Sequence, residues 1–284
     1  MARRTARPSR TSRAGIGTEP VEGAYPVDTG TARLVRSGDD PDVWTLLLDG
    51  VPSSAVHLGH PERLEFEYLQ LLAHALQLHP VPEPEPLDVV HLGGAACALP
   101  WAVETVRPGS SQVVAEHDGE LARLVRTWFA LPRSPRLRMQ VGDARTVLAG
   151  RRDASADAVV RDVFAGDVTP AHLTTREFTA DAARVLRPDG LYLANVADRP
   201  PLQLLKAEAA TVATVFEHVG VVAETALLRG RRYANAVLVG SRRPYPWSDL
   251  QRAVGRTGLA LRVLHGEPLA RLVAGAQPLE DGSG

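Results

Sequence analysis

The sequence predicts an α/β fold, in which a doubly wound, seven-stranded, mostly parallel sheet follows a small N-terminal antiparallel β unit. Two observations lead to this expectation. From residue 87 onward, short apolar runs alternate with segments of helical periodicity, which is the pattern of a parallel sheet with helices on both faces. Residues 24–58 instead contain three short β segments separated by turn residues, which is typical of a small antiparallel sheet.

These patterns divide the chain into four regions. We expect a disordered tail over 1–20, the small β unit over 21–60, the α/β domain over 61–245, and C-terminal helices with a polar tail over 246–284. The tail is rich in Arg, Ser and Thr and lacks the apolar core of a secretion signal.

The α/β domain begins with a helix over 61–78, which a Pro-rich connector at 79–86 ends. The last two strands follow each other without a helix, so we expect them to be antiparallel. Strands are predicted at 87–92, 112–116, 137–141, 157–163, 190–196, 221–228 and 232–240. Helices are predicted near 99–106, 118–130, 144–149, 174–186 and 203–218.

The composition excludes several classes of function. Formal net charge is −1, so no global field favours nucleic acid or an anionic membrane surface. No apolar run reaches the length of a membrane span. Cys97 is the only cysteine, which fits a reducing compartment and makes a Cys-based metal site impossible. The histidines are not paired with Asp or Cys residues as metal ligands would be, so we expect no bound metal. Taken together, these observations predict a cytoplasmic protein that binds neither nucleic acid nor a membrane.

Four successive strands of the domain end in residues suited to a ligand. Gly93 and Gly94 follow the first strand, Glu116 ends the second, Asp143 follows the third and Asp162 ends the fourth. Ligands of open α/β sheets bind outside the carboxyl ends of the strands. A glycine turn followed 22 residues later by an acid is typical of a nucleotide site, where the acid takes the ribose hydroxyls.

Each of these positions also has a structural interpretation. The glycines could form only a tight turn, and Glu116 could cap a helix, a role that Asp118 could fill instead. Asp143 could likewise cap the helix at 144–149. Asp162 could cap a loop or pair with a neighbouring arginine such as Arg161.

The order of these motifs is that of the class I S-adenosylmethionine-dependent, methyltransferase-like fold, and from about residue 44 to 240 the chain resembles the spermidine synthase (aminopropyltransferase) family. "LGGAAC" stands where that family has a Gly-rich loop. "VVAEHD" is similar to its ribose-binding motif, "VGDAR" to its G-D motif, and "VVRDVFAGD" to its D-S-x-D segment. "LLLDGVPSS" and "EFEYLQLL" resemble its segments ahead of the catalytic domain.

The resemblance implies a transferase of polyamine biosynthesis that moves an aminopropyl group from decarboxylated S-adenosylmethionine to a small amine. Asp162 would take the proton from the attacking amine, since an ammonium has no lone pair with which to attack. A homodimer is also implied. The resemblance places the nucleoside at Gly93, Gly94, Glu116, Asp143 and Ala144, and the amine at Tyr68, Ser53 and Tyr233.

The amine half of the resemblance is altered. Ala165 stands where the family has the second Asp of D-S-x-D, and Gln70 replaces a Glu. Burying a diamine requires paired carboxylates, so the acceptor is expected to be non-standard. Two alternatives remain: a methyltransferase that uses S-adenosylmethionine itself, and a nucleoside-binding protein without catalytic activity.

Overall fold

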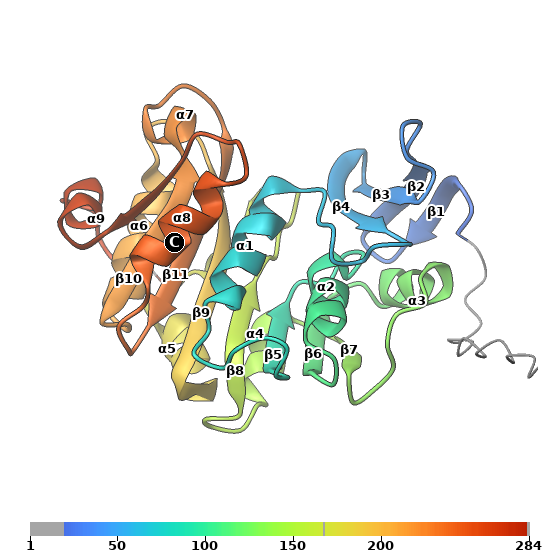
Figure 1. The fold of residues 1–284 in the computed structure, drawn as a ribbon, viewed down its shortest axis with the longest axis horizontal. Coiled ribbons are helices and arrows are strands. Elements are labelled where there is room, and N and C mark those ends of the chain that lie inside the picture. The colour runs from blue at the N-terminus through green and yellow to red at the C-terminus, as the bar shows by residue number, and fades with distance from the viewer. Residues whose placement is uncertain (1–19, 167, 283–284) are drawn as a thin grey trace, which may run out of the picture.

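The computed structural model describes residues 20–166 and 168–282 and has the predicted fold class: a small antiparallel sheet followed by a large mixed sheet between two layers of helices (Figure 1). The expected N-terminal tail, residues 1–20, lies outside the described residues except for its last one. None of the described helices is long and apolar enough to cross a membrane.

The N-terminal sheet contains four strands rather than the three that the turn signals predicted. They pair in sequence order, and each neighbouring pair is antiparallel. The turn after β1 connects this sheet to the large domain through hydrogen bonds at the start of helix α3. The N–H of Thr29 donates to the Asp118 carboxylate, and the Asp28 carboxylate accepts from the N–H groups of Gly119 and Glu120. The strands are β1 (Gly23–Val27), β2 (Gly30–Arg36), β3 (Val43–Leu48) and β4 (Val51–His57).

The large sheet has the order β12-β10-β11-β9-β8-β5-β6-β7. Strands β7, β6, β5, β8 and β9 are parallel neighbours, and the last two predicted strands, β10 and β11, are antiparallel as expected. The predicted strands are β5 (Asp88–Leu92), β6 (Ser111–Glu116), β7 (Leu137–Val141), β8 (Ala156–Arg161), β9 (Leu186–Asp198), β10 (His218–Glu224) and β11 (Ala234–Ser241).

The sheet has an eighth strand, β12 (Leu261–His265), where we expected only helices and a polar tail. Leu261 contributes to the core on one face of the sheet and Leu264 packs against the core on the other, as the alternation of a strand requires. Strand β12 pairs with β10, which gives its backbone N–H and C=O groups hydrogen-bond partners. The short, half-polar run does not reveal this pairing in the sequence. Two helices flank it, α8 (Trp247–Gly255) and α9 (Gly266–Leu272).

Helices cover both faces of the large sheet and enclose two separate cores (Figure 1). One layer consists of α1 (Glu67–Gln77), α2 (Ala98–Val106), α3 (Gly119–Trp128) and α8. The other consists of α4 (Ala144–Ala149), α5 (Arg176–Val185), α6 (Gln203–Ala213) and α9, with the short turn η1 (Ala171–Leu173). Strand β10 ends earlier than predicted, because a short helix, α7 (Thr225–Leu228), replaces its last residues.

Candidate active site

The four sequence motifs meet at one edge of the large sheet. Strands β7, β6, β5 and β8 are parallel neighbours in this order, so their carboxyl ends lie side by side. The glycine turn follows β5, Glu116 is the last residue of β6, Asp143 follows β7 and Asp162 follows β8. This is the edge at which open α/β sheets bind ligands.

The glycine turn packs directly against both neighbouring strands. Gly93 has a φ of +92°, and a Cβ there would lie 2.0 Å from the carbonyl oxygen of Asp162. A Cβ on Gly94 would lie 2.8 Å from the Val114 side chain and 3.1 Å from the Glu116 carboxylate. Neither position therefore has room for a side chain. The backbone of the turn packs directly against the ends of β6 and β8.

The remainder of the turn leads into helix α2 through two residues with left-handed backbone, Ala95 (φ +40°) and Cys97 (φ +57°). Cys97 is buried, and burial raises the pKa of its thiol to about 12. The thiol therefore stays protonated at neutral pH and has neither the charge nor the exposure of a nucleophile.

Glu116 holds the glycine turn closed. Its Oε2 atom accepts hydrogen bonds from the backbone N–H groups of Gly94 (3.1 Å) and Ala95 (3.0 Å), and its Oε1 atom accepts one from Asp118 (3.1 Å). Burial raises the pKa of Glu116 although these three hydrogen bonds favour the charged form. Asp118 is the cap of α3, accepting from the N–H of Leu121 at 2.7 Å, so Glu116 does not have the capping role.

Three backbone donors occupy three of the roughly four acceptor positions of a carboxylate. The position left open on Glu116 is on Oε1, and the side chain is only partly buried. A hydroxyl-bearing ligand could therefore bond to Oε1 without breaking the turn.

Asp143 has the capping role that the sequence left open. Its Oδ1 atom accepts from the N–H of Thr146 at 2.9 Å at the start of α4, and its Oδ2 atom lies 2.8 Å from Nε2 of His172. Partial burial opposes ionisation, but the hydrogen bonds from His172 and Thr146 outweigh it and lower the pKa of Asp143. Ala144 is buried as the first residue of α4. His172, on η1, was not predicted, because nothing in the sequence places it beside Asp143.

Arg161 and Asp162 point to opposite faces of the sheet, as successive residues of a strand do. Arg161 is fully buried and pairs with Glu208 of α6 at 2.5 Å. Asp162 instead faces α1, where it accepts a hydrogen bond from the Tyr68 hydroxyl. Asp162 and Arg161 therefore form no direct ion pair, although the charge of Arg161 still lowers the pKa of Asp162.

Asp162 is surrounded by neutral donors. Besides Tyr68, the side-chain amide of Asn195 donates to its Oδ1 atom at 2.9 Å. Burial raises the pKa of Asp162 even though the hydrogen bonds from Asn195 and Tyr68 and the charge of Arg161 favour the ionised form. A carboxylate with a raised pKa at the ligand edge of a sheet has the character of a general base.

Asn195 was not identified from the sequence. It lies on β9, next to β8, and is buried. Its Oδ1 atom has no hydrogen-bond partner among the residues that the structure describes. The one signal in the sequence was a polar residue within the apolar run "LYLANV", but only the strand pairing shows that it faces Asp162.

Beside Tyr68 lies a cavity of about 420 Å³. Tyr233 also lines it, so two of the three predicted amine-site residues line the same cavity. Ser53 is not among the lining residues, although the neighbouring Pro52 is; the Ser53 hydroxyl donates to the carbonyl of Val51 at 2.9 Å. The other lining residues are Glu65, Phe66, Glu67, Leu71, Glu224, Arg232, Ala234, Asn235 and Leu261.

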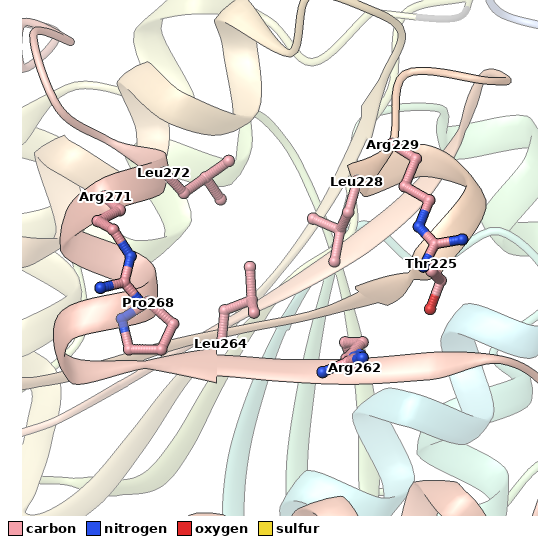
Figure 2. A pocket seen from close by; sticks show the side chains of 8 residues that line it. All are labelled: Thr225, Leu228, Arg229, Arg262, Leu264, Pro268, Arg271 and Leu272. Atoms are coloured by element: carbon pink, nitrogen blue, oxygen red, sulfur yellow. The ribbon is translucent and has the colours of Figure 1, made fainter.

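A second cavity of about 420 Å³ lies near β12, between α7 and α9 (Figure 2). Arg229, Arg262 and Arg271 line it together with leucines that pack in the core on the α6 side of the sheet. None of the predicted site residues lies there. Within 20–166 and 168–282, no group of three or more His, Cys, Asp or Glu side chains is arranged to hold a metal ion.

Comparison with known proteins gives the family. No family model matches the sequence. A probable spermidine synthase from Corynebacterium glutamicum ATCC 13032 is 37% identical in sequence, with a TM-score of 0.88 over 93% of this chain and 98% of that one. Spermidine synthase from Thermotoga maritima shares the fold, with a TM-score of 0.61 and 18% identity over 80% of this chain and 74% of that one.

A curated relative agrees with this result. Polyamine aminopropyltransferase from Vibrio vulnificus (strain CMCP6) is 29% identical over 157 residues, which are 55% of this chain. The match spans half of the length of that relative. The Corynebacterium relative, by contrast, is matched over nearly its whole length, at an identity too high for a likeness of fold alone. The chain therefore belongs to the spermidine synthase-like family of the methyltransferase-like fold.

Proposed function

We propose that the chain is an aminopropyltransferase that uses decarboxylated S-adenosylmethionine and a small amine other than the usual diamine. The observation that carries the proposal is the setting of Asp162, a partly buried carboxylate that accepts hydrogen bonds from Tyr68 and Asn195. Its backbone packs against Gly93 of the glycine turn, so a nucleoside on that turn would be adjacent to this carboxylate.

The nucleoside half of the proposal rests on the turn itself. Its backbone can approach a ligand closely because Gly93 and Gly94 carry no side chains, and Glu116 offers a free acceptor position beside them. We assign the ribose hydroxyls to Glu116, and the adenine to the region of Asp143 and Ala144. Because Asp143 already bonds Thr146 and His172, only its remaining acceptor capacity would be available to the adenine amine.

In the proposed reaction Asp162 accepts a proton from the ammonium of the acceptor. The freed nitrogen lone pair then attacks the aminopropyl carbon next to the sulfonium, so a C–N bond forms while the C–S bond breaks. The bond electrons neutralise the sulfur, and methylthioadenosine leaves. Tyr68 and Asn195 would hold the Asp162 carboxylate in place beside the attacking nitrogen.

Calorimetry and turnover test this function together. The protein should bind decarboxylated S-adenosylmethionine and methylthioadenosine, and should release methylthioadenosine when an amine is added. Transfer of a methyl group from S-adenosylmethionine would instead make the protein a methyltransferase, and nucleoside binding without turnover of any amine would leave only a binding protein.

The family resemblance also leads us to propose a cytoplasmic homodimer. A single buried cysteine suits a reducing compartment. A net charge near zero suits a protein without a strongly charged partner. Sedimentation equilibrium tests the assembly, since the 30.5 kDa chain should sediment as a species of twice its mass.

A further inference from the structure

The cavity beside Tyr68 contains an ion pair between Glu224 and Arg232. Glu224 is the last residue of β10, and Arg232 lies two residues before the neighbouring strand β11. The Glu224 side chain is only 15% exposed, whereas that of Arg232 is 52% exposed. The guanidinium therefore covers the more buried carboxylate on the cavity wall.

The other carboxylates of the cavity are placed differently. Glu65 and Glu67 also line it, but both residues are exposed. Water screens their charge, so neither offers a strong partner to a cation inside the cavity. Among the described residues that line the cavity, Glu224 is thus the best-shielded carboxylate, and Arg232 already pairs with it.

We infer that Arg232 is a specificity-determining residue that makes the protein select acceptor amines with a single positive charge. This inference rests on the proposed function, because it concerns the amine that Asp162 would deprotonate. One end of such an amine would lie at Tyr68 and Asp162. The other end would lie in the cavity along its apolar residues, Phe66, Leu71 and Leu261.

A diamine meets an obstacle in this cavity that a monoamine does not. Its second ammonium would lie near the Arg232 guanidinium and could reach Glu224 only by displacing it. Removing that guanidinium should free the Glu224 carboxylate for the second ammonium, and the new ion pair should favour the diamine. A monoamine of the same length leaves the pair intact.

The test compares putrescine with n-pentylamine, in which a methyl group replaces the second ammonium. Both amines are titrated by calorimetry into the protein, with and without methylthioadenosine. The wild type should bind pentylamine more tightly than putrescine. Arg232→Ala should tighten putrescine binding about tenfold or more, and should change pentylamine binding less than about threefold.

Two further variants make the result specific. Adding Glu224→Gln to Arg232→Ala should abolish the gain for putrescine, because the freed carboxylate is gone. Arg229→Ala removes an equal charge from the cavity of Figure 2 and should change the binding of neither amine. Putrescine binding that is unchanged or weaker in Arg232→Ala, or an equal gain in Arg229→Ala, would overturn the inference.

Failure of the proposed function gives a different result. A protein that binds no methylthioadenosine refutes the nucleoside site before any amine is added. The titrations without nucleoside still decide the role of Arg232 in that case.

Discussion

The Tyr68 hydroxyl donates a hydrogen bond to the Asp162 carboxylate, so a residue of the first helix, α1, reaches the end of strand β8. Tyr68 also lines the cavity that we assign to the acceptor amine. Tyr68 therefore connects the cavity to Asp162, which is not itself a lining residue. The first prediction follows from this contact.

Tyr68→Phe should move the acid limb of the pH–rate profile to higher pH. Burial raises the pKa of Asp162, and the hydrogen bonds from Asn195 and Tyr68 partly counteract it. Without the Tyr68 hydroxyl the pKa rises further, so the carboxylate becomes protonated, and inactive as a base, at a higher pH. The measurement is kcat/KM against pH for both proteins.

Tyr233→Phe is the matched control, since Tyr233 lines the same cavity but does not contribute to the pKa of Asp162. It should leave the acid limb where it is, whatever it does to the rate. An acid limb that stays in place or moves to lower pH in Tyr68→Phe would show that Asp162 is not the titrating base.

Glu116→Ala should weaken methylthioadenosine binding by ~1–3 kcal/mol, the usual cost of leaving polar groups without a partner. The variant removes the acceptor for the ribose and also releases the N–H groups of Gly94 and Ala95. Calorimetry measures the affinity, and a melting curve on the same sample checks the fold. Wild-type affinity in this variant would refute the ribose assignment.

Putrescine should be a poor substrate. Ala165 stands where the family has an acid, and losing a charge partner for a buried ammonium costs ~2–5 kcal/mol, or about thirtyfold or more in kcat/KM. Steady-state rates with putrescine and with monoamines measure this. Ala165→Asp should raise the rate with putrescine selectively. Rapid turnover of putrescine by the wild type would mean that another acid has taken over, either Glu67 or Asp167, the latter lying outside the described residues.

Glu208→Ala should destabilise the fold by ~3–5 kcal/mol, because it leaves the guanidinium of Arg161 buried without its charge partner. The Nε atom of Arg161 already has no partner among the described residues. Urea unfolding measures the loss. Replacing both residues together, as Arg161→Met with Glu208→Leu, should recover most of the stability, and a single variant as stable as the wild type would contradict this account.

The sequence predicted the alternation of strands and helices and the edge at which Gly93, Glu116, Asp143 and Asp162 meet, because strand ends and their spacing are local features. It could not predict the partners of these groups. Asn195 and His172 come to Asp162 and Asp143 from segments 33 and 29 residues away, through strand pairing and the position of a short turn.

The unpredicted strand β12 has a physical cause as well. Strand β12 is too short and too polar to be recognised, and it is stable as a strand only because β10 offers it an edge. The resemblance alone places Ser53 at the amine, and this stays a prediction; in the structure its hydroxyl donates to the carbonyl of Val51 on the same strand.

Asp162→Asn separates the proposed catalytic role of this residue from any structural one. Burial raises the folded-state pKa of Asp162, so the fold favours the protonated carboxyl. That contribution to stability is fully present below the pKa of the unfolded chain and is lost as the pH rises through the folded-state pKa. At neutral pH the neutral amide should therefore melt no lower than the wild type, while it keeps an oxygen that can accept from Asn195.

The most direct test of the proposed aminopropyl transfer is the release of methylthioadenosine from decarboxylated S-adenosylmethionine by wild-type and Asp162→Asn protein, with a monoamine as acceptor. We predict that the substitution lowers turnover by ~10²–10⁴, the range for loss of a general base, while the melting temperature and the affinity for methylthioadenosine stay close to those of the wild type. Full activity in a correctly folded Asp162→Asn protein would contradict the mechanism.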